Sequence, residues 1–422
     1  MCSYTSVQHQ ISDPGYYAAD NRGINLCFKN YLVACKFFQL GLNLAEQGMD
    51  VVLLEAERIG FGASGRCGGM IGSGQRKDVL EVEEAFGLER SQQLWTFAEQ
   101  AKQEVRDRVA KHDIPCDLQD GQLIGVHKRG YLGWAQELAD ALTERYAYPF
   151  CRALSAEETR EYVATDDFLE GLYDPEAMTL HPLNYTLGIA NAASDAGVRL
   201  FENSRVLSYS KTDPALVRTA QGSVKASHIV LACNGYLGNL EPRSAGKIMP
   251  INNFMVATEP LGEERALELI NGRFGVHDTR FVVNYFRLSD DYRLLFGGGE
   301  NYRPGFPRDI ERFVRPYMLR MFPQLKDVNI DYAWGGTLAV TVNRLPHVGR
   351  LEPNVYFAQG YSGHGISAAT FAGKVIAEAI AGVAGRFDGL ASLPTHTFPG
   401  GTHLRYPGMV LGMLYYGIKD RF

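Results

Sequence analysis

The sequence predicts an α/β fold of the α+β kind, in which a Rossmann-like nucleotide-binding domain is interwoven with a domain built on an antiparallel sheet. The apolar run Val51–Leu54 ends at Glu55, which is typical of a buried parallel strand. Residues 249–259 and 281–296 are rich in strand-forming side chains and indicate the second sheet. A chain of 422 residues also exceeds one typical core, so we expect two joined domains.

Glu55 and the glycine-dense stretch behind it suggest a nucleotide site. An acid at the end of the second strand of a dinucleotide fold can accept hydrogen bonds from ribose hydroxyls. Glycine lets the backbone approach a ligand closely, and successive N–H groups can form a concavity that binds anions. Arg66 adds a permanent charge, so the stretch is suited to a pyrophosphate; a glycine-rich surface loop is the alternative. Its glycines are Gly60, Gly62, Gly65, Gly68, Gly69, Gly72 and Gly74.

Composition excludes several classes of protein. Lys and Arg number 42 against 48 Asp and Glu, a net charge of −6 that argues against nucleic-acid binding. The seven cysteines are scattered without a CxxC pair, and the ten histidines show no ligand spacing, so we predict reduced thiols and no metal site. No apolar run is long enough to span a bilayer, and we expect a soluble, cytoplasmic protein. The oligomeric state cannot be predicted.

Helical periodicity predicts a series of helices along the chain. Apolar side chains recur at helix-like spacing with charges between them, and glycine, serine and proline mark several ends. The predicted helices are residues 78–112 with a break at Gly87, 131–146, a short helix opened by a capping box of Ser155 and Glu158, 182–196 beginning at Pro182, and 309–321.

Turn residues and apolar runs predict the remaining elements. Asp120-Gly121 between two extended segments predicts a hairpin over residues 114–127, and Asp174-Pro175 predicts a turn over residues 171–175. The further predicted strands are residues 198–201, 205–209, 217–220, 227–232 and 330–341, and residues 394–407 are expected to form a loop.

A second glycine turn stands near the end of the chain. The apolar run at residues 355–358 leads into Gly360, Gly363, His364 and Gly365, and a helix is predicted from about Ile366. The N-terminus of a helix stabilises an anion, so this turn is suited to hold a negatively charged group.

These motifs resemble those of a known family. The run LEAERIGFGASGRCGG, residues 54–69, resembles the second fingerprint of FAD-dependent amine and amino-acid oxidases of the D-amino-acid oxidase superfamily. Within that superfamily it is most similar to the gamma-glutamylputrescine oxidase group, which carries a G-x-G-A-S-G-R-x-G-G run. The resemblance extends from about residue 42 to about residue 382. It implies bound FAD and a primary amine that is oxidised to an aldehyde by hydride transfer to flavin N5. Ammonia and hydrogen peroxide would be released, with molecular oxygen as acceptor.

The resemblance also implies positions for the cofactor. It places the second fingerprint on the pyrophosphate and ribose, Val206 at the adenine, and the last glycine turn at the flavin pyrimidine ring. The cofactor-binding residues implied are Glu55, Ala56, Gly62, Ala63, Ser64, Gly65, Arg66, Gly68, Gly69, Val206, Cys233, Asn234, Gly235, Gly360, Gly363, Gly365 and Ile366.

Four residues are candidates for the catalytic site. His364 is placed by the glycine turn, and its alternative is a structural histidine that caps the helix. Arg287 and Tyr285 could anchor a substrate carboxylate, since arginine is suited to bidentate pairing; surface placement is the alternative. Trp334 could wall the pocket or simply belong to the core.

The resemblance implies a discontinuous domain plan. The FAD-binding domain comprises residues 21–80, 180–240 and 335–385, and the substrate domain comprises residues 81–179 and 241–334. An N-terminal arm, residues 1–20, and a C-terminal tail, residues 386–422, complete the chain.

The first fingerprint of the family, G-x-G-x-x-G after an apolar strand, is missing. The family's spacing back from Glu55 puts its glycines at Leu32, Ala34 and Phe37, after a strand expected at residues 25–31. Two alternatives therefore stay open: a sarcosine, glycine or D-amino-acid oxidase or dehydrogenase, and a non-catalytic relative with impaired FAD binding.

Overall fold

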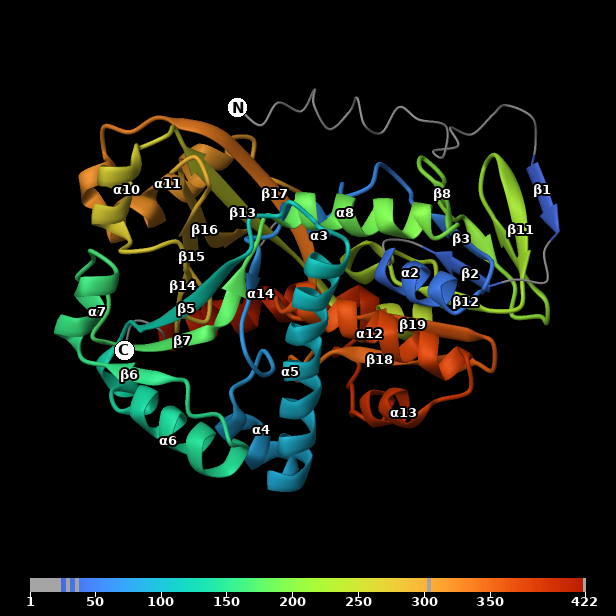
Figure 1. Cartoon of the computed structure of the whole chain (residues 1–422), viewed down its shortest axis with the longest axis horizontal. Coiled ribbons are helices and arrows are strands. Elements are labelled where there is room, and N and C mark those ends of the chain that lie inside the picture. The colour runs from blue at the N-terminus through green and yellow to red at the C-terminus, as the bar shows by residue number, and fades with distance from the viewer. Residues whose placement is uncertain (1–23, 28–30, 35–37, 302–304, 420–422) are drawn as a thin grey trace.

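The computed structural model describes residues 24–27, 31–34, 38–301 and 305–419. These residues form two halves, and the chain passes from one half to the other several times (Figure 1). The expected N-terminal arm and Phe37 lie outside the described residues. One half is built on a six-stranded sheet of order β18-β19-β12-β2-β3-β8. Its strands are β2 Tyr31–Ala34, β3 Val51–Leu54, β8 Arg199–Phe201, β12 Ile229–Leu231, β18 His347–Glu352 and β19 Val355–Gln359.

This sheet is parallel except at one edge, where β18 runs antiparallel to β19. Strand β3 is fully buried, as its unbroken apolar run predicts. Helices α2 Phe38–Glu46, α8 Pro182–Asp195 and α12 Gly365–Ile380 pack together beside it, and Leu40, Leu42 and Leu44 of α2 fill the core. A methyl group built on Gly373 of α12 would lie 2.9 Å from the Leu40 nitrogen, so glycine allows this close crossing of α12 and α2.

The second half is built on a nine-stranded, mostly antiparallel sheet. Its main path runs β17-β13-β16-β15-β14-β5-β7-β4, with β6 paired to β7. Phe254, Phe286 and Phe296 of this sheet share a hydrophobic core with Phe322, which directly follows helix α11, Ile310–Met321. The strands are β4 Met70–Ile71, β5 Gln119–Val126, β6 Arg152–Leu154, β7 Glu170–Thr179, β13 Met249–Thr258, β14 Gly275–Asp278, β15 Tyr285–Leu288, β16 Leu294–Asn301 and β17 Ile330–Val340.

Most of the predicted helices are confirmed. Residues 78–112 form two helices that break at Gly87, the helix of residues 182–196 begins at Pro182, and the capping box of Ser155 and Glu158 is present. The remaining helices are α3 Ala63–Arg66, α4 Val79–Phe86, α5 Leu88–Lys111, α6 Trp134–Tyr146, α7 Ala156–Tyr162, α9 Pro242–Ala245, α10 Glu263–Leu269, α11 Ile310–Met321, α13 Gly385–Ala391 and α14 Gly401–Lys419.

The N-terminal strand prediction is wrong in register. β1, Ile24–Cys27, pairs with β11, Gly222–Ala226, in a separate four-stranded sheet that also contains β10 Ala215–Arg218 and β9 Ser208–Tyr209. The central strand of the six-stranded sheet is β2, so Leu32 and Ala34 lie in a strand and not at loop positions. The sequence offers a reason: residues 31–34 are uncharged, whereas residues 25–31 include Lys29, and a charge is costly in a buried parallel strand.

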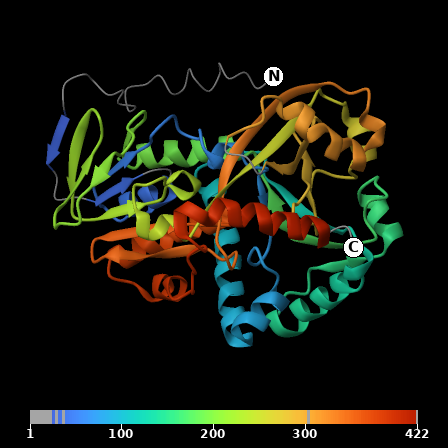
Figure 2. The same cartoon turned by 180° about the vertical axis from the view of Figure 1, so that it is seen from behind.

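Three turn or loop predictions are also wrong. Asp120-Gly121 makes no hairpin, because both residues lie in β5 at a bulge where Gly121 has φ +98°. Asp174-Pro175 lies within β7 opposite that bulge, where a residue without an N–H group is tolerated. The expected loop of residues 394–407 ends in α14, which crosses the middle of the molecule (Figure 2).

Two global features bear on function. In the part of the chain that the structure describes, no helix combines the length and hydropathy needed to cross a bilayer. Among the same residues, no group of three or more His, Cys, Asp or Glu side chains could hold a metal ion.

Candidate functional site

A cavity of about 650 Å³ is lined by residues from both halves of the molecule. Its wall includes the second-fingerprint loop, the start of α2, strands β13 and β17, the turn before α12, and one side of α14. A second hollow of about 350 Å³ lies next to it, and Cys233 and Tyr236 line both. Two joined hollows of this kind suit a ligand with two bulky ends.

Glu55 stands in the smaller hollow, where the sequence predicts a ribose contact. It directly follows β3 and is 1% exposed, and its Oε1 accepts a hydrogen bond from the Glu57 nitrogen at 3.0 Å. Ala56 and Val206 line the same hollow. The structure thus brings together three of the residues that the resemblance implies for cofactor binding, among them those expected at the ribose and the adenine.

The second-fingerprint loop forms one wall of the larger cavity. Ala63, Ser64, Arg66, Gly68 and Gly69 line it, whereas Gly62 and Gly65 do not. A methyl group built on Gly65 would lie 2.3 Å from the Gly60 oxygen, so this glycine serves the internal packing of the loop. The Arg66 guanidinium donates to the Gly335 oxygen at 3.0 Å and thereby ties the loop to β17.

The two other predicted turns are joined by a hydrogen bond. Asn234 Oδ1 accepts from the Gly360 nitrogen at 2.9 Å, and Cys233 and Asn234 line the cavity. Gly235 and Gly360 lie behind this wall: a methyl group on Gly235 would lie 2.9 Å from the Leu338 oxygen, and one on Gly360 would lie 2.5 Å from Thr341 Cγ2. The turn is completed by Gly363, Gly365 and Ile366, which line the cavity.

His364 also lines the cavity and holds the N-cap position of α12, but its side chain makes no capping hydrogen bond. A methyl group on Gly72 would lie 2.8 Å from Gln122 Oε1 and 3.4 Å from His364 Nε2, so these two side chains converge over Gly72. Burial, together with the charges of Arg76 and His277, lowers the pKa of His364 to about 3. The imidazole is therefore neutral at physiological pH.

Of the other catalytic candidates, some line the cavity and some do not. Tyr285 lines the cavity, and its hydroxyl donates to Asn253 Oδ1. Arg287 does not line the cavity: it is 2% exposed and donates to the Gly68 oxygen at 2.9 Å and to the Leu180 oxygen at 3.1 Å. The sequence predicts that Arg287 anchors a substrate, but in the structure its side chain supports the fingerprint loop.

Trp334 also lies outside the cavity wall. Its indole N–H donates to the Arg66 oxygen at 2.9 Å, so the side chain supports the fingerprint loop. Sequence reasoning missed other residues of the wall, because their neighbours in the chain carry no motif. They are Gln39, Arg76, Gln122, His277 and Arg405.

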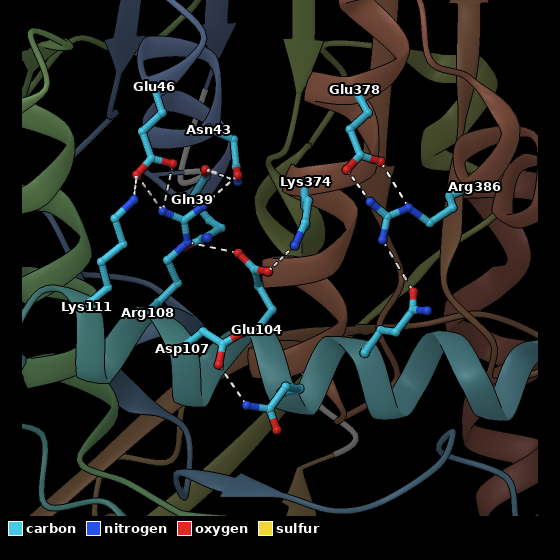
Figure 3. Close-up of polar contacts among 12 residues, drawn as sticks. Gln39, Asn43, Glu46, Glu104, Asp107, Arg108, Lys111, Lys374, Glu378 and Arg386 are labelled. Carbon is cyan, nitrogen blue, oxygen red and sulfur yellow. Dashed lines mark hydrogen bonds and ion pairs between the residues drawn. The ribbon is translucent and has the colours of Figure 1, made fainter.

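Helix α2 is held at the cavity by a buried polar cluster (Figure 3). Arg108 of α5 donates to Glu46 Oε2 at 2.8 Å and to Asn43 Oδ1 at 2.7 Å, and it pairs with Glu104 at 2.9 Å. Burial alone would raise the pKa of Glu46, but hydrogen bonds from Lys111 and Arg108 hold this pKa below its usual value. The cluster fixes the C-terminal half of α2, which contains Asn43 and Glu46, against α5.

The side chain of Gln39, in the first turn of α2, indicates whether the cavity fits a dinucleotide. Its side chain is 6% exposed and lines the cavity, and neither of its polar atoms has a hydrogen-bond partner. Buried amides are seldom left without partners, and the N-terminus of a helix favours an anion. A bound pyrophosphate or sugar chain would supply the missing partners, so the residues present fit FAD.

Comparison with known proteins identifies the family. The FAD dependent oxidoreductase family (DAO) matches residues 40–379. The chain belongs to this family. Its enzymes are oxidoreductases with FAD as cofactor, and the match begins just after Leu32, Ala34 and Phe37, where the glycines of the first fingerprint would stand.

Relatives of this flavoprotein support the same assignment. The chain is 41% identical to the gamma-glutamylputrescine oxidoreductase of Escherichia coli, over 90% of this chain and 89% of that protein. It is 40% identical to a probable oxidoreductase OrdL of Rhizobium meliloti, over 91% and 90%.

Solved structures share the fold of this oxidoreductase at low identity. The L-proline dehydrogenase of P. horikoshii has a TM-score of 0.70 at 21% identity, covering 88% of this chain and 96% of that one. The glycine oxidase of Geobacillus kaustophilus has a TM-score of 0.67 at 18% identity, covering 84% and 94%.

Proposed function

We propose that this FAD-dependent oxidoreductase oxidises the primary amine end of a substrate such as gamma-glutamylputrescine to an aldehyde. In the overall reaction the amine, molecular oxygen and water give the aldehyde, ammonia and hydrogen peroxide. The proposal is supported by the 41% identity to a protein named for that substrate. Oxygen as acceptor and a cytoplasmic location belong to the same proposal.

The observation that carries the proposal is the charge of the cavity wall. Among the described residues that line it are four arginines, Arg66, Arg76, Arg344 and Arg405, and no aspartate or glutamate. Hydride leaves the carbon beside nitrogen only when the amine is neutral. A wall with positive charge and no carboxylate lowers the pKa of a bound amine and so favours its neutral form.

The side chains around Gly72 can receive the amine. Neutral His364 can accept a hydrogen bond from the amine N–H through Nε2, and Gln122 can accept a second one through Oε1. Tyr285 and the apolar residues Met70, Phe281 and Val283 also line the cavity, and their side chains can exclude water from the reacting carbon. When bound, FAD supplies the acceptor for the hydride and its two electrons.

The chain's own residues would hold FAD in three groups. Glu55, Ala56 and Val206 would bind the adenosine end in the smaller hollow. The fingerprint loop, Cys233 and Asn234 would lie along the pyrophosphate, and the backbone of Gly363, Gly365 and Ile366 at the N-terminus of α12 would face the flavin pyrimidine ring.

Anaerobic flavin reduction tests the proposal. The purified holoenzyme is mixed with gamma-glutamylputrescine, sarcosine, glycine or D-alanine, and the main visible absorption band of the flavin is followed. We expect only the primary amine of gamma-glutamylputrescine to bleach it rapidly, and air to restore it with release of peroxide and ammonia. Faster reduction by an amino acid would replace the proposal by an amino-acid oxidase. A protein that remains colourless with added FAD would make it a non-catalytic relative.

A further inference from the structure

Two hydrogen-bond acceptors meet at one place in the wall of the larger cavity. A methyl group built on Gly72 would lie 2.8 Å from Gln122 Oε1 and 3.4 Å from His364 Nε2. Two atoms so close to a common point can both lie within hydrogen-bond distance of a single ligand atom. Gly72 itself lines the cavity and has no side chain, so a small group can enter between the two acceptors.

Gln122 is buried like a core residue but lacks the hydrogen bonds of one. It is 5% exposed and lines the cavity, and its side-chain amide makes no hydrogen bond to any residue that the structure describes. The same holds for the imidazole of His364 within the described chain. Because buried amides are seldom left without partners, a ligand is expected to supply one here.

The backbones that carry the two acceptors are fixed. Gln122 lies within β5, opposite Asp174 of β7 on one side and Gly275 of β14 on the other. His364 is the N-cap residue of α12, and its backbone nitrogen donates to the Tyr361 oxygen at 3.0 Å. The spacing of the two acceptors is therefore set by a sheet and a helix and not by a loop.

The three residues after Gly72 are each hydrogen-bonded to α5. The bonds join Lys102 Nζ to Ser73 Oγ (2.6 Å), the Gly74 nitrogen to Glu99 Oε1 (3.2 Å) and Gln75 Nε2 to the Leu94 oxygen (2.8 Å). A methyl group on Gly74 would lie 2.8 Å from Trp95 Cζ3, so the loop also packs directly on this helix. Gly72 is thus held in place beside Gln122 and His364.

We propose that Gln122 and His364 form a two-acceptor site that selects primary amines over their N-methyl derivatives, with Gln122 as the specificity-determining residue. The inference rests on the proposed function. A neutral primary amine has two N–H groups, which can satisfy both acceptors; the imidazole accepts at Nε2 in the tautomer with its proton on Nδ1. A secondary amine has one N–H group and leaves one buried acceptor unpaired, and a site built to bind an N–H rejects the analogue without it.

A matched pair of substrates tests this specificity on the holoenzyme. Gamma-glutamylputrescine and its derivative with one methyl group on the terminal amine can lose hydride from the same carbon and give the same aldehyde. For wild type we expect kcat/KM for anaerobic flavin reduction to be about 10- to 100-fold higher with the primary amine.

Variants of Gln122 separate hydrogen bonding from the size of the gap. Gln122→Met keeps much of the volume but removes the acceptor, so the preference should fall to within about threefold. Gln136→Met, at an exposed position of α6, is the matched control and should keep the wild-type preference. If Gln122→Met kept the full preference, the size of the gap would select the amine, and the proposal would be overturned.

Gly72→Ala tests the same site from the other side. Gly72 is not among the residues with positive φ, so alanine adds no backbone strain, and its methyl group meets the flexible end of Gln122. We expect kcat/KM to fall about tenfold more for the primary amine than for the N-methyl amine. The flavin absorption spectrum checks that each variant is folded and holds FAD. Equal losses for both amines would count against the two-acceptor site.

Glycine and sarcosine differ by the same methyl group and separate this inference from the proposed function. If gamma-glutamylputrescine does not reduce the flavin but glycine does so faster than sarcosine, and only with Gln122 present, the inference stands and the proposed function fails. If gamma-glutamylputrescine and its N-methyl derivative reduce the flavin equally well, the inference is overturned and the proposed function stands. If no amine reduces the flavin, calorimetric binding of the same pairs decides, and equal affinities overturn the inference.

Discussion

At the scale of single residues, Gln39 and Gln359 are both buried glutamines, but they differ in whether their side-chain amides have hydrogen-bond partners. Gln359 is 2% exposed, and its amide nitrogen has partners, since it donates to the Ser244 oxygen at 2.9 Å and lies 3.1 Å from His347 Nδ1. Gln39 is 6% exposed with no partner for either polar atom. A buried amide without a hydrogen-bond partner lowers stability by about 1–3 kcal/mol. A ligand that bonds to this amide can restore that stability.

Gln39→Leu should therefore stabilise the flavin-free protein and weaken FAD binding about tenfold. Removing the unmet amide relieves its desolvation cost, while the cofactor loses a partner. Thermal unfolding of the flavin-free protein and titration of flavin fluorescence measure the two effects. Gln359→Leu is the control and should destabilise by about 1–3 kcal/mol. If Gln39→Leu destabilised the flavin-free protein equally, its amide would be a structural group and not a ligand for FAD.

Arg287 gives a second prediction at this scale. Because its guanidinium spans the Gly68 and Leu180 oxygens, Arg287→Lys should lose at least one of these hydrogen bonds and lower the free energy of unfolding by about 2 kcal/mol. Urea denaturation measures the loss. Unchanged stability with a raised KM for carboxylate substrates would instead support a substrate role for Arg287.

At the scale of elements, the fingerprint loop is shaped by its contact with the strand that leads into α8. Gly69 has φ +84°, and a methyl group there would lie 1.9 Å from the Leu180 oxygen. Backbone so close to backbone cannot move aside without shifting β4 and the start of α8. The loop can keep this path only with glycine at Gly69.

Gly69→Ala should consequently cost several times more stability than Gly87→Ala. Gly87 has φ +79° but open space around it, so alanine there adds only backbone strain, of about 1–3 kcal/mol. Chemical denaturation of both variants separates strain from collision. Equal losses would show that the Leu180 carbonyl yields readily and that the loop is less tightly built than described.

At the scale of the whole molecule, three buried histidines link stability to pH. Burial is the main cause that lowers the pKa of His277 to about 4 and that of both His347 and His364 to about 3. In the unfolded chain these groups have the ordinary pKa of 6.5. The unfolded state therefore binds more protons below pH 6.5, and the stability present above that pH is lost as pH falls toward 4 and 3.

The free energy of unfolding should fall by roughly 1.4 kcal/mol per pH unit for each of these histidines between about pH 6 and pH 4. Urea denaturation across this range measures the slope. His347→Gln should reduce the slope by the contribution of one histidine, whereas substitution of an exposed histidine, His403→Gln, should leave the slope unchanged. A slope that did not respond to His347→Gln would mean that this histidine is already charged in the folded protein.

Much of the fold could be predicted because its signals are local. The uncharged run Val51–Leu54, the proline that opens α8 and the capping box at α7 each specify their element through nearby backbone and side-chain chemistry. The second fingerprint and the turn before α12 are likewise predicted to be cofactor loops from neighbouring residues, and residues of both line the larger cavity. By contrast, Asp120-Gly121 was misread because a bulge in a long strand and a hairpin turn use the same residues.

The sequence by itself determined the family, the cofactor and most element boundaries, since these depend on residues close together in the chain. Only the tertiary structure decided which side chains face the cavity. Arg287 reaches carbonyls 219 and 107 residues away, and Arg405 comes from a helix outside the family match. Whether an arginine braces a loop or meets a substrate depends on which distant backbone packs beside it, and no local pattern encodes that packing.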